Sequence, residues 1–324
     1  IFQSFLNNFE HYLIDTRYLI SQNNDINDNI IIVDVDKSTI NKFDIWPFPR
    51  HYWSTVINNL NKYDVKVIGI DVLFDNKSAN QNHDIHFSET LENTNNVILA
   101  AGKYVQKKYN FTSETWSKPL EIFTKNTPYG FINFPYDSDG TVRRSFMSLA
   151  SESTVIESFD YLVTSFFLET SSSKLKSNLK DTIFKEDSSD FYINYTLSNN
   201  FSRIPFYLVY EDRIPNPEIL KDKIILIGAT DPVLNDMIFS PLGILPGVDI
   251  HGHTLLTILK NKPIYELSKL LNYLLIYFLL GLISFFVFNF NVQRSSAFVF
   301  TILSFYSLFM FGLFNYYNLL GLWG

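Results

Sequence analysis

The stretch IIIVDVDKSTI, residues 30–40, decides how the first part of the chain folds. Five of its first six residues are aliphatic, which is typical of a strand buried on both faces, as in a parallel sheet. Asp34 and Asp36 then fall near the carboxyl end of that strand, where open α/β sheets usually place their sites. The stretch therefore predicts an α/β fold with two acids at a sheet edge.

The segments that follow favour parallel pairing. In RHYWSTVINNLNKY the apolar residues recur on one helix face, so we expect a helix over about 52–62. VKVIGIDVLF, residues 65–74, is a second buried strand, and Asp71 lies near its end. Strand, helix and strand at this spacing form a right-handed βαβ unit.

Further elements follow from the same patterns. We expect strands over 96–104, 191–196 and 223–228, a hairpin over 129–150, and helices over 87–94, 158–169 and from 246 onward. The residues from 107 to 118 are polar and fit no single element. The predicted fold is a mixed, largely parallel sheet flanked by helices.

Two apolar runs near the end of the sequence indicate a membrane anchor. Leu270–Phe290 and Ala297–Tyr317 carry no charge, and each matches the roughly 20 residues that a spanning helix needs. The short link between them carries a single charge, that of Arg294, so the two runs together predict a transmembrane helical hairpin. Three lysines precede the first run and oppose Arg294 under the positive-inside rule, so these charges do not fix the orientation.

Composition excludes several classes of protein. The net charge is −7 without any basic run, which argues against a nucleic-acid partner. The chain has no cysteine, so disulfides, thiolate nucleophiles and cysteine-based metal sites are excluded. The nucleotide-binding and nucleophile-elbow motifs are missing, and we expect no cofactor.

A proline-stiffened segment, WPFPR at 46–50, places Arg50 at the start of the expected helix. A cation there is unfavourable to the helix dipole unless it is paired. The strand-end acids are the expected partners, either as an internal ion cluster or as a ligand site. The candidate ligand-binding residues are Asp34, Asp36, Arg50, Asp71, Asp236 and His251.

The D-x-D pair also resembles the nucleophile strand of the haloacid-dehalogenase phosphatases. In that interpretation Asp34 is the nucleophile and Asp36 the acid/base, with Mg²⁺ held by later acids such as Asp231 and Asp236. The residues that follow, Lys37 and Ser38, depart from that family. Helix capping or simple binding by the two aspartates is the favoured interpretation.

Other polar motifs have plainer interpretations than metal binding. Two His pairs, at 83 and 86 and at 251 and 253, lack a third ligand, so no metal is expected. His251 shares a helix face with Leu255 and Ile258, which also fits a hydrogen-bonded core histidine. DSDG, at 137–140, predicts a turn rather than a calcium loop. Arg143 and Arg144, which follow this turn, should point to opposite faces of the next strand, so that only one of them reaches a given site.

Several segments occur together and in order in one family. FEHYLIDTR, IIIVDVDKSTI, WPFPR, VKVIGIDVLF, DSDGTVRR, KIILIGAT, FSPLG and PGVDIHGHTLLTIL resemble the type-two CHASE domains over about residues 9–262. The name stands for cyclase/histidine-kinase-associated sensory extracellular domain. WPFPR and SPLG followed by PGVDIHGH are the specific blocks, and Gly252 departs modestly from the usual pattern.

The resemblance implies an extracytoplasmic sensor that reports an unknown ligand or condition. It implies one span before the domain, usually three after it, and a cytoplasmic output such as an adenylate or guanylate cyclase, a kinase of a two-component system or a diguanylate cyclase. We therefore expect an entry helix and linker over 1–29 from an earlier span, a sensor domain over 30–265, and spans over 270–290 and 297–317. The expected setting is a homodimer in the inner membrane.

Two alternatives remain open at this point. One is a membrane-anchored, Mg-dependent phosphatase that uses Asp34 as its nucleophile. The other is a dimerisation module that binds no ligand. The family resemblance implies no enzymatic activity for this segment and carries no defined ligand residues.

Overall fold

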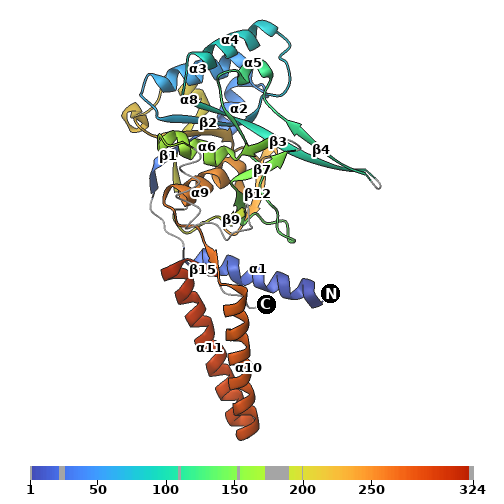
Figure 1. Cartoon of the computed structure of the whole chain (residues 1–324). Helices are drawn as coiled ribbons and strands as arrows, with labels where there is room; N and C mark the ends of the chain where they lie inside the picture. Colours follow the sequence, from blue (N-terminus) through green and yellow to red (C-terminus); the bar gives the residue numbers. More distant parts are fainter. Residues whose placement is uncertain are drawn as a thin grey trace. The chain divides into compact units, whose positions relative to one another are not determined.

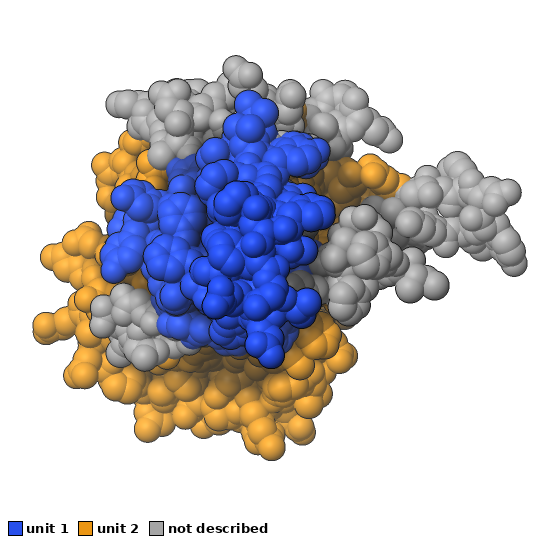
Figure 2. Space-filling view, turned by 90° about the horizontal axis from the view of Figure 1, so that it is seen from below, with its two compact units in different colours: residues 1–21, 262–324 blue, residues 22–261 orange. Residues whose placement is uncertain are grey.

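The computed structural model describes residues 2–21, 26–108, 111–151, 154–171, 190–198 and 200–320. The chain divides into two compact units, which Figure 2 colours separately. Residues 22–261 form the sheet unit, and residues 1–21 with 262–324 form the helical unit. Each unit is described by itself.

A seven-stranded sheet is the centre of the sheet unit, counted over the described residues (Figure 1). Six strands lie in the order β10, β1, β11, β2, β3, β4, and β5 pairs with β3. The strands are β1 Ile26–Val35, β2 Val67–Leu73, β3 Val97–Lys108, β4 Phe111–Ser117, β5 Tyr129–Phe131, β10 Asn200–Pro205 and β11 Ile224–Ala229. Among these described strands only β3 and β4 pair antiparallel. The predicted mixed, largely parallel sheet is confirmed.

Both faces of the central strands are buried. The odd-numbered Ile31, Val33 and Val35 of β1 pack in one hydrophobic cluster, and the even-numbered Ile30 and Ile32 pack in another on the opposite face. This explains the unbroken aliphatic run, because neither face meets water. Side chains alternate along a strand, so Asp34 lies on the same face as Ile30 and Ile32.

Short helices cover the face of the odd-numbered β1 residues. They are α2 Lys37–Phe43, α3 Arg50–Asn61, α4 Gln81–Glu92, α5 Glu121–Thr124 and α8 Phe206–Tyr210. Trp53 of α3 anchors this layer, with its ring 5.4 Å from Phe74 and 5.1 Å from Phe206. The helix predicted over 52–62 is confirmed. The one predicted over 87–94 begins earlier, at Gln81, because the Asn80 side chain accepts a hydrogen bond from the Asn82 N–H.

Two helices cover the other face, α6 Phe159–Phe167 and α9 Gly247–Leu259. The approach of α9 to the sheet is close: a Cβ at Gly228 of β11 would lie 2.6 Å from the Cβ of Val248. Glycine at this position therefore lets α9 pack directly on the central strand. Since Asp34 lies on this face, α9 is the helix that it meets.

The predicted hairpin over 129–150 is wrong. A turn does occur there, with Gly140 at φ +81° and the Gly140 N–H donating to the Asp137 carbonyl. The flanking strands pair elsewhere, because β5 joins β3 in the main sheet while β6 Arg144–Phe146 pairs with β9 Asp190–Tyr192. Two other small antiparallel pairs are β7 Ser148–Ser151 with β8 Thr154–Glu157 and β12 Met237–Ser240 with β13 Gly243–Pro246.

Two strands of the sheet were not predicted. The polar segment around 111–117 becomes β4, which pairs only with β3 in the described sheet. Asn200–Pro205 becomes β10, an edge strand beside β1. Edge strands need no continuous apolar run, and β10 ends in Pro205, so neither shows the pattern by which central strands are found.

The helical unit contains α1 Phe2–Ile20, α10 Lys269–Asn289 and α11 Val292–Tyr317. Two short strands, β14 Tyr265–Glu266 and β15 Leu319–Leu320, pair in parallel. Inside this unit the ring of Tyr18 meets that of Phe314 edge-on at 5.4 Å. Phe286 of α10 stacks on Phe298 of α11, with centroids 4.3 Å apart.

Both α10 and α11 are long and apolar enough to cross a membrane, and no other described helix qualifies. Only 6% and 17% of their most apolar stretches are buried, whereas a core helix of a soluble protein would be mostly covered. The Asn291 side chain accepts a hydrogen bond from the Arg294 N–H at 3.1 Å and begins α11 there. The pair fits a transmembrane hairpin.

Candidate functional site

Three polar residues of α9, namely Asp249, His251 and His253, are buried although each can carry a charge. Residues four apart share a helix face, so Asp249 and His253 lie on one side of α9 and His251 on the other. Groups of this kind are rarely buried without partners, and their partners come from distant parts of the sequence.

His251 is enclosed by acids and aromatic rings. Its Nδ1–H donates to both carboxylate oxygens of Asp160 on α6, at 2.9 and 3.0 Å. Its Nε2 lies 3.8 Å from an oxygen of Asp71, at the end of β2. The rings of Phe134 and Phe159 lie 4.7 and 5.2 Å from the imidazole. The imidazole is thus shut off from water while it faces two carboxylates.

These surroundings decide the charge of the group. Burial alone would lower the pKa of His251, but the carboxylates, Asp160 foremost, outweigh it and raise that pKa to about 9. Burial raises the pKa of Asp71 to about 7, and the like charge of Asp236 adds to the rise. Burial also raises the pKa values of Asp160 and Asp236. One imidazolium serves Asp160 and Asp71 and also interacts with the charge of Asp236, so the group favours uptake of a proton by one of the three acids.

Asp236 connects this group to the start of α9. Its carbonyl accepts a hydrogen bond from the Gly247 N–H at 2.9 Å. A Cβ at Gly247 would lie 2.8 Å from both carboxylate oxygens of Asp236, so the carboxylate presses against the first residue of α9. A negative charge near a helix N-terminus is stabilising. The negative charge of Asp236 therefore stabilises the N-terminus of α9.

A second ion group lies on the other side of α9. Arg203 of β10 donates from Nη1 to Asp34 at 2.8 Å and from Nη2 to both oxygens of Asp249, at 2.8 and 2.6 Å. Burial raises the pKa of Asp34 to about 6 although Arg203 opposes the rise. Burial likewise raises the pKa of Asp249. One guanidinium serves two buried carboxylates, which leaves a net negative charge when both are ionised.

His253 differs from His251 although the two share a helix. It lies against the rings of Tyr195 and Phe201, at 5.0 and 5.2 Å, and its Nδ1 has no hydrogen-bond partner among the described residues. Burial lowers its pKa to about 3, and the positive charge of Arg203 adds to the fall. His253 is therefore a neutral ring.

Together the two ion groups fasten α9 to four other elements. His251 joins it to α6 and β2, and Asp249 joins it through Arg203 to β10 and β1. Buried ion pairs of this kind add little net stability but cost several kcal/mol when one partner is lost. A change of charge or of contact at either group would therefore change how α9 is held.

The prediction that Arg50 pairs with the strand-end acids is wrong. Its Nε donates to Asp84 of α4 at 3.3 Å, and its Nη2 donates to the Asn76 carbonyl at 2.7 Å. Its guanidinium lies over the ring of Phe74, 4.7 Å from the centroid. The reason is that α3 covers the opposite face of the sheet from Asp34, so the sheet separates the two charges.

Asp36 takes the capping role that the sequence left open. It accepts hydrogen bonds from the Thr39 N–H at 2.9 Å and the Ser38 hydroxyl at 2.6 Å, and so begins α2. Burial alone would raise its pKa, but these hydrogen bonds outweigh it and lower the pKa. The six predicted candidates thus separate: His251 lies on α9 and three acids lie on the same side of the sheet near it, Asp36 caps α2, and Arg50 lies on the other face.

Sequence reasoning missed Asp160, Arg203 and Asp249. Asp160 and Asp249 fall inside predicted helices, where a single acid looks like a solvent-facing residue. Arg203 falls in the unpredicted β10. The available signal was Asp249 itself, the single acid of a helix without lysine or arginine, two residues before His251.

The two arginines that follow the turn at 137–140 also differ from expectation. Asp137 accepts hydrogen bonds from Arg143 on one oxygen at 2.9 Å and from Arg144 on the other at 2.8 Å. Both arginines therefore reach one carboxylate, against the prediction that only one could. Asp139 also binds Arg143, at 2.8 and 3.1 Å. These acids are engaged in holding the turn.

The residues that a phosphatase would use are occupied in other roles. Asp34 is paired with Arg203, Asp36 caps α2, and Asp231 caps a short 3-10 helix by accepting from the Val233 N–H at 2.9 Å. Among the residues that the structure describes, no group of three His, Asp or Glu side chains could hold a metal ion. The carboxylate that a phosphatase would use as its nucleophile is thus held by Arg203 in an ion pair.

Comparison with known proteins supplies the family. A family model described as the CHASE2 domain matches residues 1–286, which include the whole sheet unit. Searches of curated proteins and of solved structures gave no match. The match covers most of the chain, and it confirms the resemblance that the sequence blocks indicated.

Proposed function

Because this chain belongs to the CHASE2 domain family of extracellular sensor domains, we propose that it is the extracytoplasmic sensing part of a membrane receptor. The sensor occupies about residues 30–265, after an entry helix and linker over 1–29. Spans over 270–290 and 297–317 anchor it in the inner membrane. The receptor works as a homodimer and controls a cytoplasmic cyclase, kinase or diguanylate cyclase.

One observation carries this proposal: α9 belongs to both ion groups and also leads to the membrane helices. It ends at Leu259, and α10 begins at Lys269 after a short segment of chain. A stimulus that alters the hold on α9 thus has a covalent route to a span. A ligand or condition acts only through its different affinity for the two states of such an element.

The candidate sensing residues of this route are Asp34, Asp71, Asp236 and His251. Their contacts support the role, because His251 lies on α9 beside Asp71, Asp236 lies against the first residue of α9, and Asp34 reaches α9 through Arg203. A population shift of about a hundredfold needs a difference of only ~3 kcal/mol between two states. Loss of one buried charge contact is of that size.

Disulfide cross-linking tests the relay without any output module. The chain has no cysteine, so single cysteines at Tyr273, Leu274 and Tyr277 of α10 report contacts between copies in membranes. We expect cross-linking at helical spacing, and we expect Asp71→Asn to change which positions react. Asp212→Asn, at an exposed surface pair with Lys62, is the matched control and should leave the pattern unchanged.

The outcomes separate the alternatives. Cross-linking that is unchanged by Asp71→Asn would support a ligand-free dimerisation module, and no cross-linking at any position would contradict the dimer.

Membrane topology is tested with single-cysteine variants as well. An impermeant maleimide should label Asn82→Cys on intact cells and Gln293→Cys only after permeabilisation, and the reverse result would exclude an extracytoplasmic sheet unit.

A further inference from the structure

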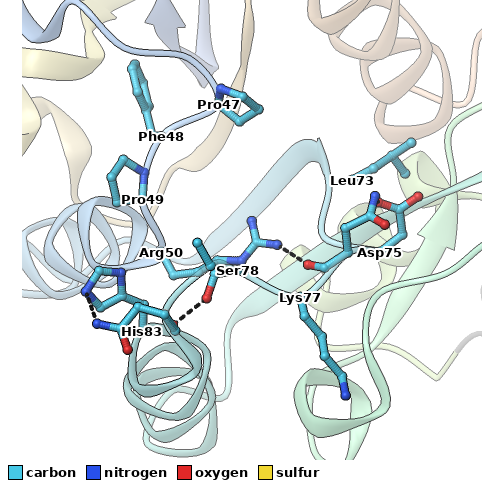
Figure 3. Close-up of a pocket in the computed structure, with 12 residues that line it drawn as sticks. Pro47, Phe48, Pro49, Arg50, Leu73, Asp75, Lys77, Ser78 and His83 are labelled. Atoms are coloured by element: carbon cyan, nitrogen blue, oxygen red, sulfur yellow. Dashed lines mark hydrogen bonds between the residues drawn. The ribbon is translucent and has the colours of Figure 1, made fainter.

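A cavity lies on the face of the sheet away from α9. Its volume is about 540 Å³, within the range of small-molecule sites. It is lined by the WPFPR segment, the end of β2 and the loop that leads into α4. Figure 3 shows Phe48, Pro47 and Pro49 on one side of Arg50, and Leu73 and Asp75 on the other. The cavity belongs wholly to the sheet unit.

Arg50 is held in place within this cavity. Its guanidinium stacks on the Phe74 ring, and its Nε and Nη2 donate to Asp84 and to the Asn76 carbonyl. An arginine has five N–H donors, and Nη1 has no partner among the described residues. The guanidinium therefore presents a fixed, partly desolvated pair of nitrogens to an incoming group.

The loop opposite is also fixed before any ligand arrives. Asp84 binds Arg50 with one oxygen and accepts the Ser78 N–H with the other, at 2.9 Å. The Ser78 hydroxyl donates to the Asn80 carbonyl at 2.6 Å. A preformed loop and a preformed cation reduce the entropy that binding must overcome.

The chemistry of the walls limits the ligand. Phe48, Leu73 and two prolines offer apolar surface, while Arg50 offers a fork that matches a carboxylate. Asp75 also lines the cavity, and its two oxygens accept from Asn76 and Ser117. A carboxylate accepts up to about four hydrogen bonds, so Asp75 has room for an ammonium group.

We propose that this cavity binds a small organic carboxylate with a short apolar body. The carboxylate takes the Nη1 and Nη2 edge of Arg50, and the apolar body lies against Phe48 and Leu73. An α-amino acid would in addition place its ammonium group at Asp75. The proposal names a ligand class for the proposed sensor. Only its biological meaning rests on the sensor function, because binding to the cavity is measured without signalling.

Isothermal titration calorimetry on the full chain in detergent tests the inference with three probes of one shape. They are leucine, 4-methylpentanoate, which lacks the amino group, and 3-methylbutylamine, which lacks the carboxylate. We expect binding of at least one carboxylate and none of the amine. If leucine binds and 4-methylpentanoate does not, the ligand is an amino acid, and Asp75→Asn should then abolish the difference.

Variants assign the binding to this cavity. Arg50→Lys keeps the charge but loses the fork, and it should weaken binding roughly 10- to 100-fold. Ala79→Phe should fill the cavity and abolish binding, while Asn82→Phe, in the same segment but not in the lining, should leave it intact. Arg213→Gln, whose side chain is 70% exposed, is the arginine control.

Three results would overturn the inference. They are tighter binding of the amine than of either carboxylate, no heat with any probe at millimolar concentration, and unchanged binding in Ala79→Phe. None of these results bears on the proposed sensor role, which is tested separately by the cross-linking of α10. Conversely, α10 cross-linking that is unchanged by Asp71→Asn would refute the relay and leave the binding site intact.

Discussion

His251 and His253 lie two residues apart on α9 and are both buried. Nevertheless His251 is a cation and His253 is neutral. The cause is local, since His251 faces carboxylates while His253 faces aromatic rings and a guanidinium. Burial disfavours the charged imidazole in both, and only the acids reverse that preference. The same residue type therefore serves as a buried cation at one position and as a neutral ring at the other.

The first prediction concerns the stability of the fold against pH. The pKa of His251 is raised from 6.5 to about 9, so the folded state binds its proton more tightly than the unfolded state. The stabilisation is complete below pH 6.5 and is lost as pH rises through 9. We expect the free energy of unfolding to fall by on the order of 3 kcal/mol between pH 6.5 and 9. Urea denaturation at several pH values measures it.

Two variants check the origin of that slope. His251→Gln should remove the slope above pH 7 and lower stability at all pH values, because Asp160 and Asp71 lose their partner. His86→Gln, at an exposed position of α4, should leave the slope as it is. The carboxyl of Asp71, with its pKa raised to about 7, acts in the same direction between pH 4 and 7. A rise of stability toward pH 9 would contradict the assignment.

At the scale of elements, α9 depends on a close approach to β11 at Gly228. Gly228→Ala would place a methyl group 2.6 Å from the Cβ of Val248, both of which belong to rigid elements. Overpacking of this kind costs about 1–3 kcal/mol. We expect the thermal midpoint to fall by roughly 3–10 °C. Scanning calorimetry of the full chain in detergent measures the change.

Gly102→Ala is the matched control for this substitution. Its added methyl group would lie 3.3 Å from the ring of Tyr104, an exposed side chain that can move away, and 3.5 Å from Leu73 Cδ1, which is an ordinary van der Waals contact. The midpoint should shift by less than about 2 °C. Equal losses in the two variants would mean that the α9 contact is not special.

At the scale of the whole molecule, each unit has its own packing. The sheet unit buries both faces of its sheet with its own helices, so residues 22–261 alone should fold in water and unfold cooperatively. Circular dichroism and size-exclusion chromatography of this fragment test the expectation. Aggregation of the fragment under all conditions would contradict it.

A shorter fragment is the control for that experiment. Residues 22–246 lack α9 and its buried Val248, Ile250, Leu255, Leu256 and Ile258. Burying five such side chains contributes on the order of 10 kcal/mol, which is as large as the stability of a typical domain. We expect this fragment to be insoluble.

Much of the fold was predictable because its signals are local. The aliphatic run at 30–35, the amphipathic pattern of α3 and the uncharged stretches of α10 and α11 each specify an element from consecutive residues alone. β4 and β10 were missed because edge strands lack such a run. The turn at 137–140 was found, but the pairing of its neighbours was not.

The site was only partly predictable, because contacts depend on which face of the sheet each helix covers. The two acids at the end of β1, the arginine at the start of α3 and the apolar anchor are evident from consecutive residues alone. The placement of α9 and α3 on opposite faces depends on how distant segments pack together. As a result Asp34 pairs with Arg203, and Arg50 pairs with Asp84. Side chains alternate along a strand, so the sheet itself stands between charges that are close in sequence. The partner of a buried charge can instead lie far along the chain, as Arg203 lies 169 positions from Asp34.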